Sequence, residues 1–542
     1  MWSQRTGQGP TGDVVNASAT EPQPVSSTRV DDLAAAVGRG SLAVLLAWRD
    51  AEAPEHPFLF IEDQSAWTFG ELTAAAARLA GELAAAGVSH GDRVLCRIGN
   101  DERFLAVLAA GWSLGAAVIA MHPGVPHHDA HRVAASMDAR AAVVDPGEAD
   151  DLSLLGLTVV PFARLTHEGV AVARALAVPD VAGDEPALVL LTSGSTGTPK
   201  GVVLTHDNAW SNLRATVSAF RSNTDPTPLP TVAKPPNLIA NPLSHTAGVV
   251  RLLFALYVGR DVVLLRKFGG ALAKRLVDQY GIDNLTLNPA MLRMLLDEVP
   301  VGQKLGAVRY VSSGTAPLTP ALREEFESRF DVPVLQAYGQ TEAFGGIAIE
   351  SVRDVLAGRR RAGSVGRALP GVEIRIVDEH GVERPSGCDG EIWVRSRSAT
   401  VGYLNADETT PLGSDGWLRT GDRGYLDNDG YLYITGRLKN IIICGGFNIA
   451  PEEVEAVLEE DPRVVEAVVI SRPDERLGEI PVAVVESTAA PEALLESARP
   501  RLVSYKRPRA LFTVSSLPRV PNGKIDRAAV ARLVTQLEGS GS

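Results

Sequence analysis

A short loop of small and hydroxyl residues around one lysine is the stretch of the sequence best suited to bind a charged ligand. The loop reads Thr192, Ser193, Gly194, Ser195, Thr196, Gly197, Thr198, Pro199, Lys200 and Gly201. Glycines let the backbone approach a ligand and turn its N–H groups toward one centre. Hydroxyls add hydrogen-bond donors and the lysine adds a positive charge, so the loop predicts a polyphosphate site. The alternative is a flexible surface turn, because the same residue types favour turns.

The loop differs from a Walker phosphate-binding sequence in the residues around its lysine. Pro199 precedes Lys200 and Gly201 follows it, where the Walker pattern has glycine before the lysine and serine or threonine after it. The hydroxyl that would hold magnesium is therefore missing, and we expect the magnesium ligand elsewhere in the chain.

The loop resembles the phosphate loop of the adenylate-forming superfamily, which includes acyl-CoA synthetases, aryl-CoA ligases, luciferases and peptide-synthetase adenylation domains. The resemblance extends over roughly residues 32–533, with further family-like motifs in the same order at Asn241–Gly248, Ser313–Pro317, Val334–Glu342, Asp415–Asp422, Ile434–Arg437 and Pro521–Arg527. It implies ATP and coenzyme A as co-substrates and Mg²⁺ as the cofactor.

The resemblance implies a nucleotide site at the ends of two predicted strands. Beside Thr192–Thr198 and Lys200, its residues would be Gly314, Thr315, Ala316, Tyr338, Gly339, Gln340, Thr341, Glu342, Asp422, Arg437 and Lys524. Tyr338 would stack on the adenine. Thr341 would donate to the α-phosphate, and Glu342 would hold the Mg²⁺, which prefers oxygen ligands. Asp422 would accept hydrogen bonds from the ribose hydroxyls.

The end of the chain carries the remaining catalytic expectation. Lys524 follows an Asn-Gly turn and alone would be read as a solvated lysine, but it resembles the catalytic lysine of the family. The catalytic set implied by the resemblance is therefore Lys524, Thr192, Lys200 and Glu342. A hinge is expected at residues 438–440, with Lys439 as the pivot, and Gly445 and Gly446 would border the pantetheine tunnel.

The acyl substrate would lie near His245, which the resemblance places beside the acyl carboxylate. The residues expected to line this site are His245, Ala247, Gly248, Gly314 and Ala343. Relatives that activate amino acids have an aspartate between positions 241 and 248, and none occurs here, so an acid without an α-amine is favoured. Ser244 and Ala247 are small where aromatic residues are frequent, which predicts a large hydrophobic acid, long-chain or polycyclic.

Composition limits the class of protein and its compartment. The chain has 542 residues and a formal net charge of −13, which argues against nucleic acid as the main partner. Cys96, Cys388 and Cys444 are few and far apart, which favours free thiols in the cytoplasm. No apolar run reaches membrane-spanning length. The sequence leaves the oligomeric state open, as monomer or homodimer.

Alternating strand-like and helix-like segments predict an α/β fold of layered, mostly parallel sheets. Residues 1–28 are expected to be a disordered leader, 29–437 an N-terminal adenylation domain, and 441–542 a small mobile α+β domain. The alternating pattern of residues 366–395 predicts a small antiparallel sheet within the large domain.

Two further motifs have simpler explanations than catalysis or metal binding. Gly111–Gly115 matches the hydrolase pattern Gly-x-Ser-x-Gly, but a helix-like segment precedes it and a strand follows, which predicts a helix packed on a sheet. His122, His127, His128 and His131 have conceivable metal spacing, yet nearby prolines favour a polar surface loop.

We therefore expect an ATP-dependent acyl-CoA ligase that forms an acyl-AMP and transfers the acyl group to coenzyme A. The first alternative is an enzyme that loads the acyl group onto a carrier protein. The second is a nucleotide-binding module without catalysis, which the combination of Lys524, Glu342 and the hinge motif disfavours.

Overall fold

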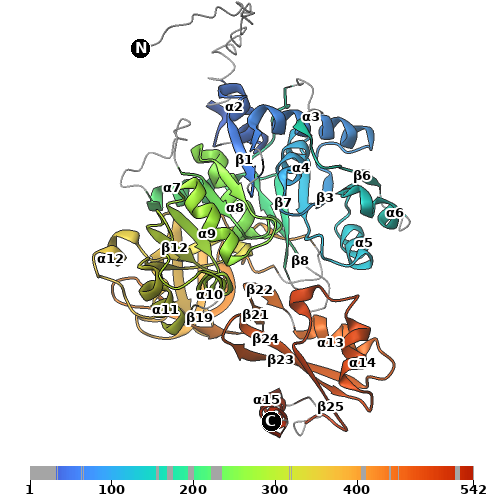
Figure 1. Cartoon of the computed structure of the whole chain (residues 1–542), viewed down its shortest axis with the longest axis vertical. Coiled ribbons are helices and arrows are strands. Elements are labelled where there is room, and N and C mark those ends of the chain that lie inside the picture. Colours follow the sequence, from blue (N-terminus) through green and yellow to red (C-terminus); the bar gives the residue numbers. More distant parts are fainter. Residues whose placement is uncertain are drawn as a thin grey trace, which may run out of the picture.

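The computed structural model describes most of the chain. The described residues are 32, 35–38, 40–62, 64, 66–153, 158–167, 175–192, 200–220, 235–315, 318, 320–404, 410–438, 441–449, 451–518, 525 and 527–540. The expected leader, residues 1–28, lies outside them. A large α/β body is joined to a smaller unit at one end (Figure 1).

A seven-stranded sheet contains the two strands on either side of the phosphate loop. Its order is β18-β8-β7-β4-β3-β5-β6, and the five strands from β7 to β6 are parallel. Strand β8 runs antiparallel to both of its neighbours, β7 and β18. The strands are β3 (Arg93–Arg97), β4 (Ala117–Ala120), β5 (Ala141–Val144), β6 (Val159–Pro161), β7 (Pro186–Thr192), β8 (Lys200–Thr205) and β18 (Gly402–Tyr403).

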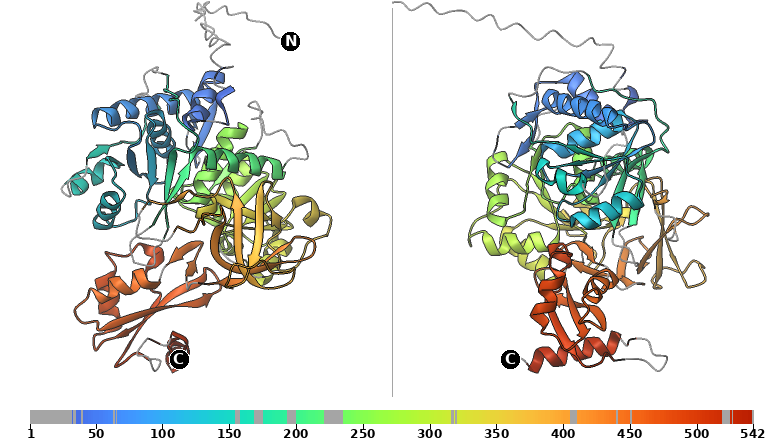
Figure 2. Two further views of the ribbon diagram at one scale, coloured as in Figure 1. Left: turned by 180° about the vertical axis from the view of Figure 1, so that it is seen from behind. Right: turned by 90° about the vertical axis from the view of Figure 1, so that its right-hand side faces the viewer.

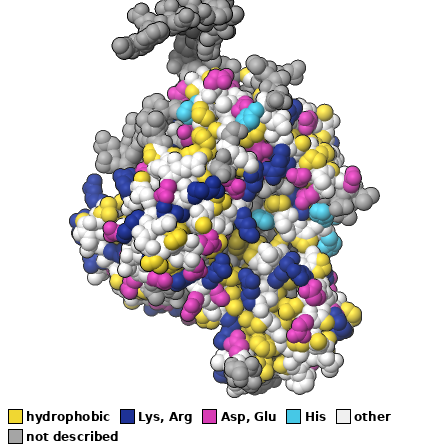
Figure 3. Space-filling model, in the orientation of Figure 1, with side chains coloured by type: hydrophobic (Ala, Val, Ile, Leu, Met, Phe, Trp, Pro, Cys, Tyr) yellow, Lys and Arg dark blue, Asp and Glu magenta, His cyan; other side chains and the backbone are white. Residues whose placement is uncertain are grey.

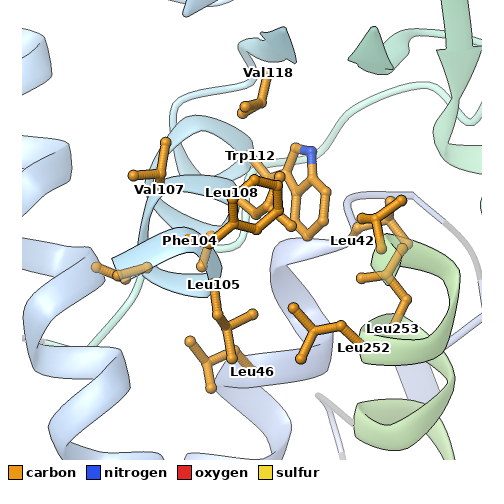
Figure 4. Close-up of a cluster of buried hydrophobic side chains, with 14 of the residues drawn as sticks. Leu42, Leu46, Phe104, Leu105, Val107, Leu108, Trp112, Val118, Leu252 and Leu253 are labelled. Atoms are coloured by element: carbon orange, nitrogen blue, oxygen red, sulfur yellow. The ribbon is translucent and has the colours of Figure 1, made fainter. Parts of the chain in front are cut away.

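Helices pack around this sheet through a large apolar core. They are α2 (Ala43–Glu52), α3 (Phe69–Ala85), α4 (Glu102–Ser113), α5 (His127–Ser136), η1 (Pro146–Glu148), α6 (Ala149–Ser153), α7 (His206–Phe220) and α8 (Thr246–Val258). Helix α3 begins where Thr68 and Glu71 cap each other, with N–O distances of 3.2 and 2.9 Å. In the core, Trp112 of α4 lies near Leu42 and Leu253 (Figure 4). This packing holds α8 in a fixed position.

Two further mixed sheets complete the layers of the large body. One has the order β2-β1-β10-β9 and the other β11-β12-β13-β14-β15, and most neighbouring strands in the central parts are parallel. Their strands are β1 (Pro57–Ile61), β2 (Ala66–Thr68), β9 (Asn237–Ile239), β10 (Val262–Leu264), β11 (Asn284–Leu287), β12 (Tyr310–Ser313), β13 (Val334–Gln340), β14 (Gly345–Ile349) and β15 (Arg367–Ala368). The accompanying helices are α9 (Gly270–Tyr280), α10 (Pro289–Glu298), α11 (Pro320–Phe330), η3 (Thr341–Ala343) and α12 (Val352–Leu356).

The predicted small antiparallel sheet is confirmed as β16-β17-β19-β20. Its strands are β16 (Val372–Val377), β17 (Gly390–Ser396), β19 (Leu418–Leu426) and β20 (Leu432–Arg437). The smaller unit has its own sheet, β22-β21-β24-β23, with β25 parallel to β24. Its elements are β21 (Ile442–Cys444), β22 (Phe447–Ile449), α13 (Pro451–Glu459), β23 (Glu466–Asp474), β24 (Gly478–Glu486), α14 (Pro491–Ala498), η4 (Ser504–Lys506), β25 (Ala510–Val514) and α15 (Arg527–Ser540).

The whole arrangement confirms the predicted α/β class. Figure 2 shows the smaller unit below the large body from two further sides, with β21 and β22 at the junction in Figure 1. Within the described residues no helix is long and apolar enough to cross a membrane. The exact domain limits and the three-residue hinge stay predictions, because residues 439 and 440 are outside the described part of the chain.

The hydrolase-like motif and the histidine cluster have different outcomes. Helix α4 ends at Ser113 before β4, and a Cβ on Gly111 would lie 2.6 Å from Val118 Cγ2, which confirms a helix packed closely on the sheet. The expected surface loop is wrong from His127 onward, because α5 begins there. Pro126 directly precedes the helix and Asp129 lies in its first turn, and both are helix-start signals.

Candidate nucleotide and acyl site

The two ends of the phosphate loop meet as a cross-strand pair. Thr192 ends β7 and Lys200 begins β8, and the antiparallel register places them opposite each other. The sequence folds this way because apolar residues on both sides of the loop form strands buried in the sheet. Residues 193–199 between them, including Ser193, Gly194, Ser195, Thr196, Gly197 and Thr198, lie outside the described residues.

A tyrosine connects the lysine of this loop to the predicted magnesium ligand. The Nζ atom of Lys200 lies 5.0 Å from the centre of the Tyr403 ring, and the Tyr403 hydroxyl donates to Glu342 Oε1 at 2.9 Å. Strand β18 positions Tyr403 because it pairs with β8. The structure therefore brings Lys200 and Glu342 together through a residue that the sequence reasoning missed.

The hydroxyl of Thr341 lies at the junction with α8. Thr341 Oγ1 and Thr246 Oγ1 are 2.9 Å apart, so η3 and the first turn of α8 are held together. Glu342 follows directly in η3, and its carbonyl accepts a hydrogen bond from the Thr400 N–H at 2.7 Å. The residues expected at the α-phosphate and at the metal are therefore adjacent and fixed from two sides.

Tyr338 and Asp422 form one wall of a cleft of about 960 Å³ between the two units. The Tyr338 hydroxyl donates to Asp422 Oδ2 at 2.7 Å, and Asp422 is almost fully buried. Thr315 and Gly339 line the same cleft. The carboxylate expected to take the ribose hydroxyls thus already has a tyrosine donor, which fixes its orientation.

Close backbone approach explains the glycines expected in the nucleotide site. A Cβ on Gly314 would lie 3.1 Å from the Ala337 carbonyl oxygen, and one on Gly339 only 1.8 Å from that of Gly345. Thr315 has a φ of +69°, a conformation that is uncommon for a residue with a side chain. The Nε2 atom of Gln340 is buried and has no hydrogen-bond partner among the described residues, so its donor capacity is unused.

His245 is half-buried at the start of α8, and its imidazole is neutral at physiological pH. Burial, and next the nearby His122 and Lys506, lower its pKa to about 4. Its Nε2 atom is buried without a hydrogen-bond partner in the described structure. The ring lies edge-on to Phe447, with 5.0 Å between ring centres. A neutral imidazole with an unsatisfied nitrogen is suited to meet a polar group of the acyl substrate.

The other residues expected around the acyl group have different surroundings. Ala247 is partly exposed on α8, as a pocket wall would be. Gly248 allows close packing instead, since a Cβ there would lie 2.2 Å from the Pro242 carbonyl oxygen. Ala343 is buried among apolar side chains of the small antiparallel sheet.

The smaller unit contacts the large body through the predicted pantetheine glycines. The Asn288 side-chain amide donates to the Gly445 carbonyl at 3.1 Å, and a Cβ on Gly446 would lie 2.8 Å from Thr315 Oγ1. Next to them, Phe447 stacks on Tyr505 with ring centres 4.1 Å apart. The two glycines therefore lie against Asn288 and against Thr315, a residue expected in the nucleotide site.

Several expected residues lie outside the described part of the chain. These are Ala316, the hinge residue Lys439 and the catalytic lysine Lys524, together with the loop residues named above. For Arg437 only the backbone is described, and it pairs with Asp422 across β19 and β20. The roles of these residues stay predictions.

The donor set fits Mg²⁺ at Glu342. No group of three or more His, Cys, Asp or Glu side chains forms a metal cage within the described residues. Mg²⁺ needs no such cage, because one or two carboxylates and the phosphates of a substrate are its usual ligands. Glu342 offers a carboxylate next to Thr341 and near Lys200.

Comparison with known proteins connects this geometry to a family. The family of AMP-binding enzymes matches residues 46–404, and its C-terminal domain matches residues 453–524. The chain is 34% identical to the sulfoacetate–CoA ligase of Cupriavidus necator, over 90% of this chain and 96% of the relative. It is 30% identical to a long-chain-fatty-acid–CoA ligase of Mycobacterium tuberculosis, over 84% and 91% of the two chains.

Solved structures show the same likeness. The o-succinylbenzoate CoA synthetase of Bacillus subtilis with its product analogue OSB-NCoA is 29% identical and has a TM-score of 0.77, over 89% of this chain and 97% of that chain. The same enzyme in complex with AMP has a TM-score of 0.64, with 28% identity over 89% and 96% of the chains. The amide bond synthetase McbA of Marinactinospora thermotolerans has a TM-score of 0.77, with 31% identity over 90% and 99%.

The chain therefore belongs to the family of AMP-binding, adenylate-forming enzymes. It is an enzyme of the acid–thiol ligase class, the class of its CoA ligase relatives.

Proposed function

We propose that the protein is an ATP-dependent acyl-CoA ligase that works in two half-reactions. The observation that carries the proposal is the group formed by Lys200, Tyr403, Glu342 and Thr341 beside His245, whose Nε2 atom is buried. It places a cation, a carboxylate for the metal and a hydroxyl donor next to a site suited to an acyl group.

The first half-reaction overcomes the poor reactivity of a carboxylate as an acyl donor. A carboxylate oxygen attacks the α-phosphorus of ATP, the bond to the β-phosphate oxygen breaks, and an acyl-AMP and pyrophosphate form. The protein mainly has to position the reactants and stabilise negative charge. Lys200 and Thr341 would bind phosphate oxygens, His245 would orient the acid, and Lys524 would stabilise the developing charge. Mg²⁺ held by Glu342 would neutralise phosphate charge.

In the second half-reaction the thiol of coenzyme A attacks the acyl carbonyl and AMP leaves. The contact of Gly445 and Gly446 with Asn288 and Thr315 supports this step, because glycines leave room for a slender pantetheine chain. The TM-score is 0.77 to the relative bound with a CoA product analogue and 0.64 to the same relative bound with AMP. This difference supports an arrangement of the two units suited to the second half-reaction. We propose that the smaller unit rotates between the two steps. Free coenzyme A is the proposed acceptor, and a carrier protein is the alternative.

The walls near His245 favour an acid of considerable size. Ser244 and Ala247 are small, and Ala247 is partly exposed on α8, so the predicted large substrate is kept in the proposal. We propose a cytoplasmic enzyme, in line with the three cysteines, none of which forms a disulfide.

A panel of carboxylic acids tests the proposed function. With ATP and Mg²⁺, at least one acid should release pyrophosphate, and addition of coenzyme A should then give a thioester and AMP. Lys524→Ala should reduce pyrophosphate release by about 10²–10³-fold, as for the loss of a major charge-stabilising donor. Thioester formation from supplied acyl-AMP should persist in this variant. Pyrophosphate release without thioester, or thioester from a carrier protein alone, would contradict coenzyme A as the acceptor.

A further inference from the structure

Arg251 is a half-buried arginine on α8 that the proposed chemistry does not use. Within the described residues it has no carboxylate partner and no hydrogen bond. Burial lowers its pKa to about 10, while nearby Tyr310 raises it and Arg260 lowers it. The side chain is therefore still charged at physiological pH. The guanidinium is half-buried and has lost part of its hydration, which an anionic partner would offset.

The register of α8 places Arg251 on the same stripe as the predicted acyl wall. Ala247 and Arg251 are four residues apart and so lie above each other on one face of the helix. Both are partly exposed, whereas the next residues, Leu252 and Leu253, are fully buried. In Figure 4 these two leucines lie on the side of α8 that faces α2, near Leu42. The accessible stripe with Arg251 is therefore a different face of the helix from the one in the core.

Strands β11 and β12 carry two buried hydroxyls, on Thr286 and Ser312, that have no partner among the described residues. On β12, Val311 is in the apolar core with α9, α10 and α11, so Tyr310 and Ser312 point to the opposite face of the sheet. Ser312 pairs in register with Thr286 of the parallel strand β11. Burial raises the pKa of Tyr310, and the charge of Arg251 lowers it. Tyr310 is on the same face of β12 as Ser312, so this face of the sheet is turned toward the arginine.

This polar group lies at a distance from the reactive end of the acyl site. Arg251 is six residues beyond His245, which corresponds to about 9 Å along the helix axis. Val250, the residue before it, lies close to β14, since a Cβ on Gly345 would be 3.8 Å from Val250 Cγ2. The acyl group can thus extend from His245 and Thr341 along α8 toward Arg251.

We propose that Arg251, with Ser312 and Thr286, forms an anion-binding subsite at the far end of the acyl pocket. The substrate would then be a carboxylic acid with a second anionic group, such as a carboxylate or sulfonate, at its distal end. A guanidinium binds such groups through two parallel hydrogen bonds, and the hydroxyls add donors. This inference rests on the proposed function and replaces the wholly hydrophobic acid expected from the sequence.

Length-matched pairs of acids test the subsite. Pyrophosphate release and thioester formation are measured with α,ω-dicarboxylic or ω-sulfonic acids and with monocarboxylic acids of the same chain length. The wild type should prefer one length of the dianionic series over its uncharged partner by at least about 10-fold in kcat/KM, mainly through KM. Arg251→Met should remove this preference, and Arg251→Lys should restore part of it. Arg78→Met, at an exposed site on α3, is the control and should change nothing.

Three results separate the possible failures. If the wild type prefers the uncharged acids, or if Arg251→Met keeps the preference for dianions, the subsite is wrong although the ligase activity stands. If no acid of either series releases pyrophosphate, both the proposed function and the subsite are contradicted. If Arg251→Met does not fold, two other measurements test the subsite. One is the preference of Ser312→Ala for the dianionic acids, and the other is the shift in Tm of the wild type with each acid of a pair. A larger shift with the dianion supports the subsite, and an equal shift overturns it.

Discussion

Tyr403 makes two contacts at the candidate site, one with the face of its ring and one with its hydroxyl. Its face is directed to the Lys200 ammonium, and its hydroxyl orients the Glu342 carboxylate. A cation over an aromatic ring is stabilised by the electron-rich face of the ring. The residue therefore keeps the Lys200 ammonium, proposed to bind phosphate, and the Glu342 carboxylate, proposed to bind the metal, at a fixed separation.

Tyr403→Phe should lower the rate of adenylation by about 10-fold at limiting Mg²⁺, because a hydrogen bond to a charged group is lost while the ring remains. Saturating Mg²⁺ should restore most of the rate. Tyr403→Ala should show a larger loss that Mg²⁺ does not restore, since Lys200 also loses its support. Equal rates of wild type and Tyr403→Phe at every Mg²⁺ concentration would show that Tyr403 does not position Glu342.

Buried histidines should make the protein less stable in acid. Burial lowers the pKa of His206 to about 4, and its Nδ1 accepts a hydrogen bond from the Leu42 N–H at 3.1 Å. The unfolded chain binds this proton at a higher pH than the folded protein does, near the ordinary value of 6.5. The stabilisation is therefore complete above about pH 6.5 and is lost as the pH falls toward 4.

The apparent Tm should thus decrease between about pH 7 and pH 5, and His206→Asn should flatten part of the decrease, because asparagine offers an acceptor that does not titrate. His380→Asn is the matched control, since His380 is largely exposed at 77%. An unchanged pH profile in His206→Asn would rule out His206 as a source of the acid sensitivity.

At the level of single residues, the sequence predicted the site residues that belong to a recognisable motif. Lys200 and Glu342 belong to such motifs, whereas Tyr403 and Arg251 do not. Tyr403 is 61 residues from its partner Glu342, and only the pairing of β18 with β8 brings them together. For Arg251 a signal was available, because its spacing from Ala247 is that of one helix face, but the two small residues near His245 directed attention to size instead.

At the scale of elements, α8 positions the acyl site by its close approach to the preceding turn. His245 precedes the helix, and the N–H of Gly248 donates back to the His245 carbonyl at 3.0 Å. Position 248 cannot accommodate a side chain, because the Pro242 carbonyl occupies the space where a Cβ would lie. The helix start and the orientation of His245 therefore depend on this glycine.

Gly248→Ala should reduce stability by about 1–3 kcal/mol, the usual cost of overpacking, and should also raise KM for the acid because His245 moves. Thermal unfolding and acid titrations would measure the two effects. Gly81→Ala is the control on α3, where a Cβ meets nothing within 4 Å, and it should stabilise slightly. A variant Gly248→Ala as stable as the wild type would show that the turn can relax without cost.

Most elements near the site could be predicted, because apolar runs between turn residues indicate buried strands. The two strands on either side of the phosphate loop, the strand ending at Ser313 and the small antiparallel sheet all follow such patterns. The start of α5 at His127 was not predicted, because the prolines near it suggested a loop. The packing of Ala343 into the small sheet also has no local signal, since it depends on strands distant in the sequence.

At the scale of the whole molecule, the two units share a surface on which the proposed rotation depends. The junction with β21 and β22 is visible in Figure 1, and on the face in Figure 3 acidic, basic and apolar side chains are mixed. Gly446 lies at this junction with a φ of +88°, and a Cβ there would approach Thr315 and Asn288 to 2.8 and 3.1 Å. Any side chain at this position opposes the contact between the units.

Gly446→Ala should therefore keep pyrophosphate release within a few fold and lose most thioester formation, because only the second step needs this contact. Single-turnover rates of each half-reaction would measure the two effects. Gly430→Ala introduces the same kind of backbone strain at a φ of +78°, but nothing lies within 4 Å of the added Cβ. It should spare both steps, and equal losses of both steps in Gly446→Ala would contradict the proposed rotation.

The most direct test of the central claim follows an oxygen atom. The acid that gives the highest pyrophosphate release is labelled with ¹⁸O in its carboxylate, and the products are analysed by mass spectrometry after one turnover with ATP and coenzyme A. Attack of the carboxylate on the α-phosphorus predicts one ¹⁸O atom in AMP and one in the thioester. Label in inorganic phosphate, with ADP as the nucleotide product, or a thioester formed without transfer of label to AMP, would contradict an acyl-adenylate mechanism.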